Sequence, residues 1–328
     1  MLRATPASRT ECAKSVMLVG GPAGRSLAEP CGMAFKKILC PTDFSPGAQH
    51  AMRVAVRLAS EHDAELVLAH AWYLPPTAIA GEFMYSGELV QQVSDEAERS
   101  LSEAVEEAAK LGARRVTSKL LSGPPWQQIV ETAQNDAACD LIVIGTRGRT
   151  GLARVLLGSV AELVIRHAPC SVLAVHPDGG DQPFHHALCA TDFSPSSRDA
   201  VNLGAALVQP GGAGITLLHV LELPVRYAGE PHEPELCRAL DARASALLDK
   251  WTDGLAAKTA VPVSQRTRIG YAGAQVLAAV DDDPTIDLVA MGSHGRTGIA
   301  RILLGSVAEK VARHARCPVL VARSRPAT

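Results

Sequence analysis

The chain has 328 residues, enough for two domains of ordinary size that each bury a core of their own. Its net charge of −2 gives no reason to expect nucleic acid as the main partner. No apolar stretch approaches the roughly 18 residues of a membrane-spanning helix. The chain is 47% hydrophobic but only 4% aromatic, which is typical of an α/β protein with parallel strands and Ala-rich helices.

The leader, residues 1–32, mixes Pro, Gly, Ser, Ala and basic residues without a helix or strand period. We predict that it is disordered. Met33 is followed at once by a predicted strand, so it is an alternative start of the protein.

The first repeat alternates predicted strands and helices. Ser45 followed by Pro46 predicts an N-cap and the first residue of a helix. A second, long amphipathic helix over 90–108 is stopped by Gly112. The strands are predicted at 36–40, 65–70, 115–121, 140–144 and 170–175, and a short helix is predicted at 127–134.

A glycine-rich stretch occurs twice, at residues 145–162 and 292–309, each time directly after an apolar run. Both copies end in Ser-x-x-Glu, which predicts a capping box at a helix start. The serines are Ser159 and Ser306. A strand, a glycine-rich loop and a helix N-terminus form a place where backbone N–H groups point at an anion, usually phosphate.

The whole pattern restarts after a predicted linker at 178–183. Between the pairs Asp43–Asp192 and Gly145–Gly292 the register slips by only two residues, so the duplication covers a whole domain. We therefore expect domains at 33–178 and 183–328. We assign His185 and His186 to the linker region, where they lack further metal ligands, and we expect them to be solvated.

The eight cysteines include no C-x-x-C pair. Cys40 matches Cys189, and Cys170 matches Cys317, all in or beside predicted strands. We interpret them as small buried hydrophobic residues in a reducing cytoplasm, because metal and disulfide interpretations lack the usual spacing.

Helical crossovers imply parallel strands with right-handed connections, and ligands bind such sheets beyond the carboxyl ends of the strands. The Thr-Asp-Phe-Ser-Pro loops at 42–46 and 191–195 and the glycine loops all leave such ends. If the first and fourth strands are neighbours, the two kinds of loop flank one site.

At these residues the chain resembles the universal stress protein family in its tandem two-domain form, from Met33 to Arg323. The ATP-binding branch of that family carries Gly-x2-Gly-x9-Gly-Ser/Thr. The chain matches this pattern twice, at Gly145, Gly148, Gly158 and Ser159, and at Gly292, Gly295, Gly305 and Ser306.

The resemblance implies an α/β fold of two tandem open-sheet, Rossmann-like (adenine nucleotide alpha hydrolase-like) domains. Each has a five-stranded parallel sheet of order 3-2-1-4-5 with helices on both faces. It also implies ATP across each glycine loop, with Asp43 and Asp192 near adenine or ribose and Ala71 and Val220 lining the adenine pocket. The glycines and serines, with the amides of Val160 and Val307, would hold ribose and phosphates. The remaining implied positions are Pro41, Thr42, Ile144, Ala190, Thr191 and Met291.

Several residues keep alternative interpretations. Asp43 and Asp192 can ligate Mg²⁺ beside ATP, or each can serve only a structural role beside a helix cap. The loop arginines Arg149, Arg154, Arg296 and Arg301 either contact phosphate or are solvated. His70 and His219 are expected to be packed, and His294 has no counterpart, because Arg147 takes its place in the first copy. The substitutions Pro41 to Ala190 and Arg147 to His294 imply that the two affinities differ.

The leading functional hypothesis is a cytoplasmic ATP-binding stress protein, a nucleotide-dependent module whose occupancy alters the binding of an unknown protein partner or the survival of stress. The alternatives are a slow ATPase or self-phosphorylating enzyme, and a regulatory protein with vestigial pockets. The lysine of a P-loop is missing from both glycine loops, and no nucleophile–base pair recurs. We expect an intramolecular pair of domains joined at their fifth strands, 170–175 and 317–321, because bare apolar edges invite pairing. A homodimer of chains is a further possibility.

Overall fold

The computed structural model describes residues 35–73, 87–147, 157–176, 181–222, 233–295 and 304–323. The predicted leader, residues 178–180 of the predicted linker, Gly148 and the loop arginines at 149, 154, 296 and 301 lie outside these residues. Among the described helices, none combines the length and apolar character needed to cross a bilayer.

Each half of the chain is built from alternating strands and helices. The first half consists of β1 (Lys37–Pro41), α1 (Pro46–Glu61), β2 (Glu65–Trp72), α2 (Gly87–Lys110), β3 (Val116–Ser122), α3 (Pro125–Gln134), β4 (Cys139–Gly145), α4 (Ser159–His167) and β5 (Ser171–Val175). The second half consists of β6 (His186–Ala190), α5 (Pro195–Leu207), β7 (Gly214–Leu221), α6 (Glu233–Ala256), β8 (Val263–Ile269), α7 (Ala272–Asp282), β9 (Leu288–Gly292), α8 (Ser306–His314) and β10 (Val319–Ala322). The predicted strands and helices are found, with ends that coincide or shift by up to three residues.

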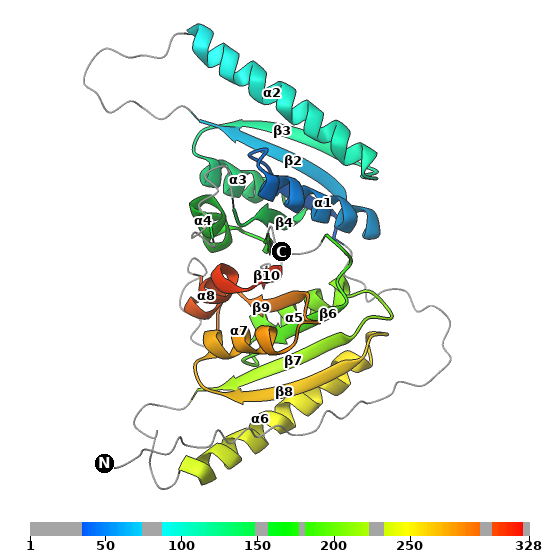
Figure 1. The fold of residues 1–328 in the computed structure, drawn as a ribbon, viewed down its shortest axis with the longest axis vertical. Coiled ribbons are helices and arrows are strands. Elements are labelled where there is room, and N and C mark those ends of the chain that lie inside the picture. The colour runs from blue at the N-terminus through cyan, green and yellow to red at the C-terminus, as the bar shows by residue number, and fades with distance from the viewer. Residues whose placement is uncertain are drawn as a thin grey trace, which may run out of the picture.

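The strands form one ten-stranded sheet in the order β3-β2-β1-β4-β5-β10-β9-β6-β7-β8. Each half is parallel and has the order 3-2-1-4-5 that the resemblance implies. The halves lie end to end along the long axis, with α2 and α6 at opposite ends (Figure 1). The α/β architecture is therefore as predicted.

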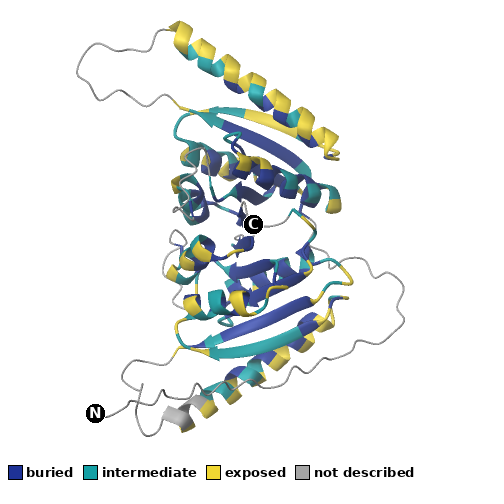
Figure 2. Cartoon of the chain, viewed as in Figure 1, coloured by how far each residue is buried: buried dark blue, intermediate teal, exposed yellow. Residues whose placement is uncertain are grey.

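The core is two apolar layers, one on each face of the sheet, and both run through both halves. One layer joins the sheet to α1, α2, α5 and α6 through residues such as Leu58, Leu101, Val201 and Leu248. The other joins it to α3, α4, α7 and α8. The strands near the middle of the molecule are buried while the outer helix faces are exposed (Figure 2).

The first helix of each half starts as its sequence predicts. The Ser45 side chain accepts a hydrogen bond from the Ala48 N–H, and Pro46 is the first residue of α1. Ser194 caps α5 in the same way, by accepting from Ser197. These caps fix where the chain turns after β1 and β6.

The predicted capping boxes at the glycine stretches are wrong. The N-caps of α4 and α8 are Gly158 and Gly305, and neither helix has a side-chain cap. Each capping glycine donates its N–H back across the loop, from Gly158 to the Thr146 carbonyl at 2.7 Å and from Gly305 to Ser293 at 2.9 Å. The capping glycine is therefore the last residue with extended backbone, and the serine that follows it is the first residue of the helix.

The predicted contact between the fifth strands is confirmed. β5 and β10 pair antiparallel, with Leu173 directly opposite Leu320, and both side chains are fully buried. Beside this pair, Arg323 donates from Nη2 to the carbonyls of Ile165 and Arg166 at the end of α4. The second half therefore caps a helix of the first.

An ion-pair quartet joins α4 to α8. It consists of Glu162, Arg166, Glu309 and Arg313, and each guanidinium contacts both carboxylates at 3.0–3.4 Å. The glutamates expected to complete capping boxes thus bridge the two halves instead.

Candidate functional site

The loop after β1 is held tightly by its own polar groups. The Thr42 N–H donates to the Ala69 carbonyl at 2.8 Å, and the Thr42 hydroxyl oxygen accepts from the Phe44 N–H at 3.0 Å. Asp43 Oδ1 accepts from both the N–H and the hydroxyl of Ser45. One carboxylate oxygen of Asp43 therefore holds the loop in shape through these hydrogen bonds, which supports a structural role for Asp43.

The loop after β6 repeats this geometry. The Thr191 N–H donates to the Leu218 carbonyl at 2.8 Å, and the Thr191 hydroxyl oxygen accepts from the Phe193 N–H at 3.0 Å. Asp192 Oδ1 accepts from the Ser194 N–H at 3.0 Å. The loops after β1 and β6 therefore have the same hydrogen-bonded conformation.

An aromatic residue in the left-handed region marks both loops. Phe44 has φ 62° and Phe193 has φ 66°, a conformation that costs a bulky residue on the order of 1–3 kcal/mol. The Phe44 ring packs on His70 with centroids 4.5 Å apart, and His70 Nδ1 donates to the Thr42 carbonyl at 2.7 Å. His219 repeats both contacts. The histidines are packed, as predicted, and they hold the strained aromatic residues in place.

The first glycine of each stretch is required by close packing. A Cβ on Gly145 would lie 2.7 Å from the Gly47 carbonyl oxygen at the start of α1, and a Cβ on Gly292 would lie 2.7 Å from Ser196 Oγ. Among the positive-φ glycines that the structure describes, none belongs to the motif. Left-handed backbone is therefore not what requires glycine at these described positions, whereas close packing against α1 and α5 does require it at Gly145 and Gly292.

The two kinds of loop lie against one another, as expected if the first and fourth strands are neighbours. β1 pairs with β4, and β6 pairs with β9. Asp192 Oδ2 lies 3.0 Å from the position of a Cβ on Gly295. The Ser196 hydroxyl donates to the His294 carbonyl at 2.6 Å. Loop residues far apart in sequence therefore meet at one edge of the sheet.

The other residues that the resemblance implies also occupy this carboxyl edge. Pro41 and Ala190 end β1 and β6, while Ile144 and Met291 are the penultimate residues of β4 and β9. Ala71 and Val220 each stand one residue before the end of their strand. Ser159 and Val160 open α4, and Ser306 and Val307 open α8. Of the implied set, Gly148 lies outside the described residues.

The copies differ in a buried polar contact that the sequence pattern did not reveal. In the first, the Thr146 hydroxyl contacts His176 Nδ1 at 3.2 Å, and both residues are buried. In the second, Ser293 contacts the adjacent His294 at 2.8 Å. The histidine therefore comes from the residue after β5 in one copy and from the glycine loop in the other.

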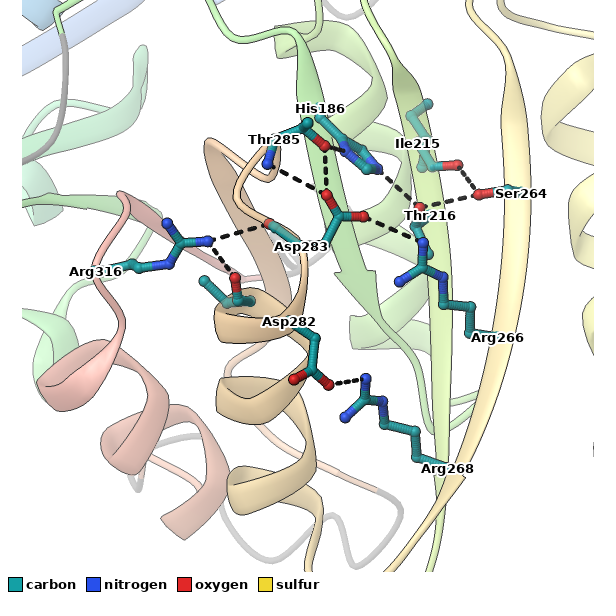
Figure 3. Close-up of polar contacts among 11 residues, drawn as sticks. His186, Ile215, Thr216, Ser264, Arg266, Arg268, Asp282, Asp283, Thr285 and Arg316 are labelled. Carbon is teal, nitrogen blue, oxygen red and sulfur yellow. Dashed lines mark hydrogen bonds and ion pairs between the residues drawn. The ribbon is translucent and has the colours of Figure 1, made fainter. Parts of the chain in front are cut away.

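The prediction that His186 is solvated is wrong. It begins β6 and is buried between Thr216 and Thr285 (Figure 3). The Thr285 hydroxyl donates to Asp283 at 2.6 Å, so it accepts from His186 Nδ1 at 2.8 Å, and Nε2 accepts from Thr216 at 2.9 Å. Burial lowers the pKa of His186. The prediction failed because His186 is the first residue of β6 and does not belong to the linker region.

The strand cysteines behave as predicted at three positions. Burial raises the pKa of Cys40, Cys189 and Cys317 to about 12. Such thiols hold a very small thiolate fraction at neutral pH and react slowly.

The comparisons with known proteins agree with this geometry. A sequence model of the universal stress protein family matches residues 34–176 and again residues 183–323. The chain belongs to the universal stress protein family. It carries two tandem copies of the family's domain, each with its own carboxyl-edge loops.

Named relatives support the same assignment. A universal stress protein of Methanocaldococcus jannaschii is 38% identical over 144 residues, which cover 43% of this chain and 82% of the relative. One from Mycobacterium tuberculosis is 34% identical over 243 residues, covering 70% of this chain and 77% of the relative. The crystal structure of a universal stress protein from Archaeoglobus fulgidus superposes with a TM-score of 0.66 at 21% identity, covering 88% of this chain and 98% of that one. This last likeness concerns the fold.

Proposed function

We propose that this universal stress protein binds ATP at two sites, one at the carboxyl edge of each half. The observation that carries the proposal is the meeting of Asp192 with Gly295, which brings an acidic loop and a glycine loop of the ATP-binding pattern together. The first half has the same strand neighbours and the same Asp loop.

The groups present suit a nucleotide. The first N–H groups of α4 and α8 have no side-chain cap, and the N-terminal end of a helix favours negative charge. In the proposal these amides, at Ser159–Val160 and Ser306–Val307, and the serine hydroxyls hold phosphate oxygens. Asp43 and Asp192 accept ribose hydroxyls through their carboxylates. Ala71 and Val220, half-buried at the strand ends, border the base.

The proposed role is regulatory: nucleotide occupancy alters binding to a protein partner in the cytoplasm. The buried thiols of Cys40 and Cys189 suit a reducing compartment. We assign no base to activate water, so ADP formation with bound ATP is expected to be absent or slow.

Calorimetric titration of the folded, nucleotide-stripped chain tests the proposal. We expect two ATP per chain in the wild type, one in G148V or in G295V, and none in the double variant. Gly254, where an added Cβ meets nothing within 4 Å, provides the control G254A, which is expected to keep both sites.

A stoichiometry of zero in the folded wild type would refute the nucleotide proposal. A stoichiometry of one would mean that the copies have diverged, with the His294 copy as the first suspect. Repeating the titration with EDTA and with Mg²⁺ shows whether the cation takes part.

A further inference from the structure

Two buried cysteines of the first half lie side by side at the amino edge of the sheet, away from the proposed sites. The sulfurs of Cys139 and Cys170 are 4.0 Å apart, and each residue is 2% exposed. A disulfide requires about 2.05 Å between sulfurs. The two sulfurs must therefore approach by about 2 Å, a distance within reach of side-chain rotation with a small backbone adjustment.

Both cysteines stand where regular structure begins rather than inside it. Cys139 opens β4, and the β1–β4 register shifts there, between Lys37 and Ile38. Cys170 lies between the C-cap of α4 and the start of β5. Ladder hydrogen bonds therefore restrict this end of the two strands less than their interiors.

A small recess reaches Cys139. It has a volume of about 10 Å³, and its lining includes Lys37, Lys119 and Asp136 beside the cysteine. That volume corresponds to about one water-sized molecule. The lining also includes Leu39, Val67 and Thr132, so both polar and apolar groups border the approach of a small, uncharged oxidant to one of the two sulfurs.

The second half provides an internal contrast. Cys317 matches Cys170, but Ile286 takes the place of Cys139 and is itself buried. The pair is therefore a feature of the first half alone, and the spacing of the cysteines in the sequence gave no sign of it.

We propose that Cys139 and Cys170 are a redox-active pair that hydrogen peroxide closes into a disulfide. Cys139 gives up its thiol proton as its sulfur attacks one peroxide oxygen, the O–O bond breaks, and the departing oxygen takes up that proton to leave as water, which gives a sulfenic acid. Cys170 then attacks that sulfur, the S–O bond breaks, and a second water leaves as the S–S bond forms. Two thiols and one peroxide become one disulfide and two waters.

The disulfide would enclose a segment of the chain that contains the first glycine loop. Residues 140–169, between the two cysteines, contain the rest of β4, the first glycine loop and α4. The bond ties the two ends of this segment and restricts its opening. The second glycine loop has no such tie, so oxidation acts on the two halves unequally.

The test uses the full chain, treated with hydrogen peroxide, alkylated and digested without reduction for mass spectrometry. We expect a Cys139–Cys170 cross-linked peptide that dithiothreitol removes and that C139S and C170S both lack. Hydrogen exchange at residues 157–167 is expected to slow by about tenfold or more on oxidation of the wild type, and to stay unchanged in C139S.

The variant I286C places a second cysteine at the matching position and is expected to add a cross-link from position 286 to Cys317. Its failure to do so in a folded protein would overturn the geometric basis of the proposal. Oxidation of the folded wild type that stops at sulfinic acid, or cross-links that involve only other cysteines, would also overturn it. None of these measurements depends on nucleotide binding.

Discussion

The ion-pair quartet between α4 and α8 offers a measurable test of how the two halves are held together. Each side chain is 27–38% exposed, and each glutamate contacts both arginines. Half-exposed pairs contribute about 0.2–1 kcal/mol each. E162Q removes two such contacts and leaves two guanidinium groups facing the single carboxylate of Glu309. We expect a loss of about 1–2 kcal/mol in unfolding free energy.

A double-mutant cycle isolates one pair of this quartet. E162Q and R313Q each remove two contacts, and the double variant removes three because one contact is shared. Urea unfolding should therefore give a coupling of about 0.5–1 kcal/mol. The coupling should shrink in 0.5 M NaCl, where the Debye length falls to roughly 4 Å.

The matched control is the pair Glu96–Arg99 on α2, which is about 70% exposed on both sides and far from the interface. Its cycle should give less than about 0.5 kcal/mol. If E162Q costs no more than E96Q, or if the Glu162–Arg313 coupling is absent at low salt, then the quartet does not stabilise the contact between the halves.

Three further predictions address single residues. G145A should lower the melting temperature by several degrees, at a cost of about 1–3 kcal/mol, because its Cβ meets backbone, whereas G87A has open space and should not. Burial lowers the pKa of His186 in the folded state below its unfolded value of about 6.5. Neutral His186 therefore contributes its full stability above pH 6.5, and this contribution is lost as the pH falls below 6.5. H186Q should thus flatten part of the fall in melting temperature below pH 6.5, with His62, also lowered by burial, accounting for a remainder. R323Q should speed hydrogen exchange in the last turn of α4, which Arg323 caps, and unchanged exchange there would contradict the capping role.

Much of the fold could be predicted because the information is local or periodic. Apolar runs, the Ser45–Pro46 start and the duplication located the strands and helices. The β5–β10 contact could also be predicted, since an apolar strand at the end of each domain leaves an edge that must be covered.

The failures arise where a residue's role depends on a distant partner. Ser159 matches the capping-box pattern, but the hydrogen bond from Gly158 to Thr146 places the cap one residue earlier. The left-handed backbone of Phe44 depends on His70, which is 26 residues away in sequence and comes from another strand. No local pattern contains either contact.

The loops after β1 and β6 agree closely between the two halves, whereas the amino edges differ in a polar contact. At the carboxyl edge the histidine contacts of Thr42 and Thr191 have the same length, 2.7 Å. At the amino edge Lys37, ion-paired to Asp136 at 2.8 Å, is replaced by the hydrogen-bonded His186.

The carboxyl-edge loops are therefore features that both halves share, whereas the amino-edge contacts belong to one half each. A ligand at the carboxyl edge meets nearly the same backbone loops in both halves, so a large difference in affinity must come from side chains such as His294. The amino edges respond to different chemical signals: the first half has a cysteine pair open to oxidation, and the second has a buried histidine that disfavours protonation. Peroxide should therefore act through the first half, so that it perturbs one proposed site while the other serves as its reference within the same chain.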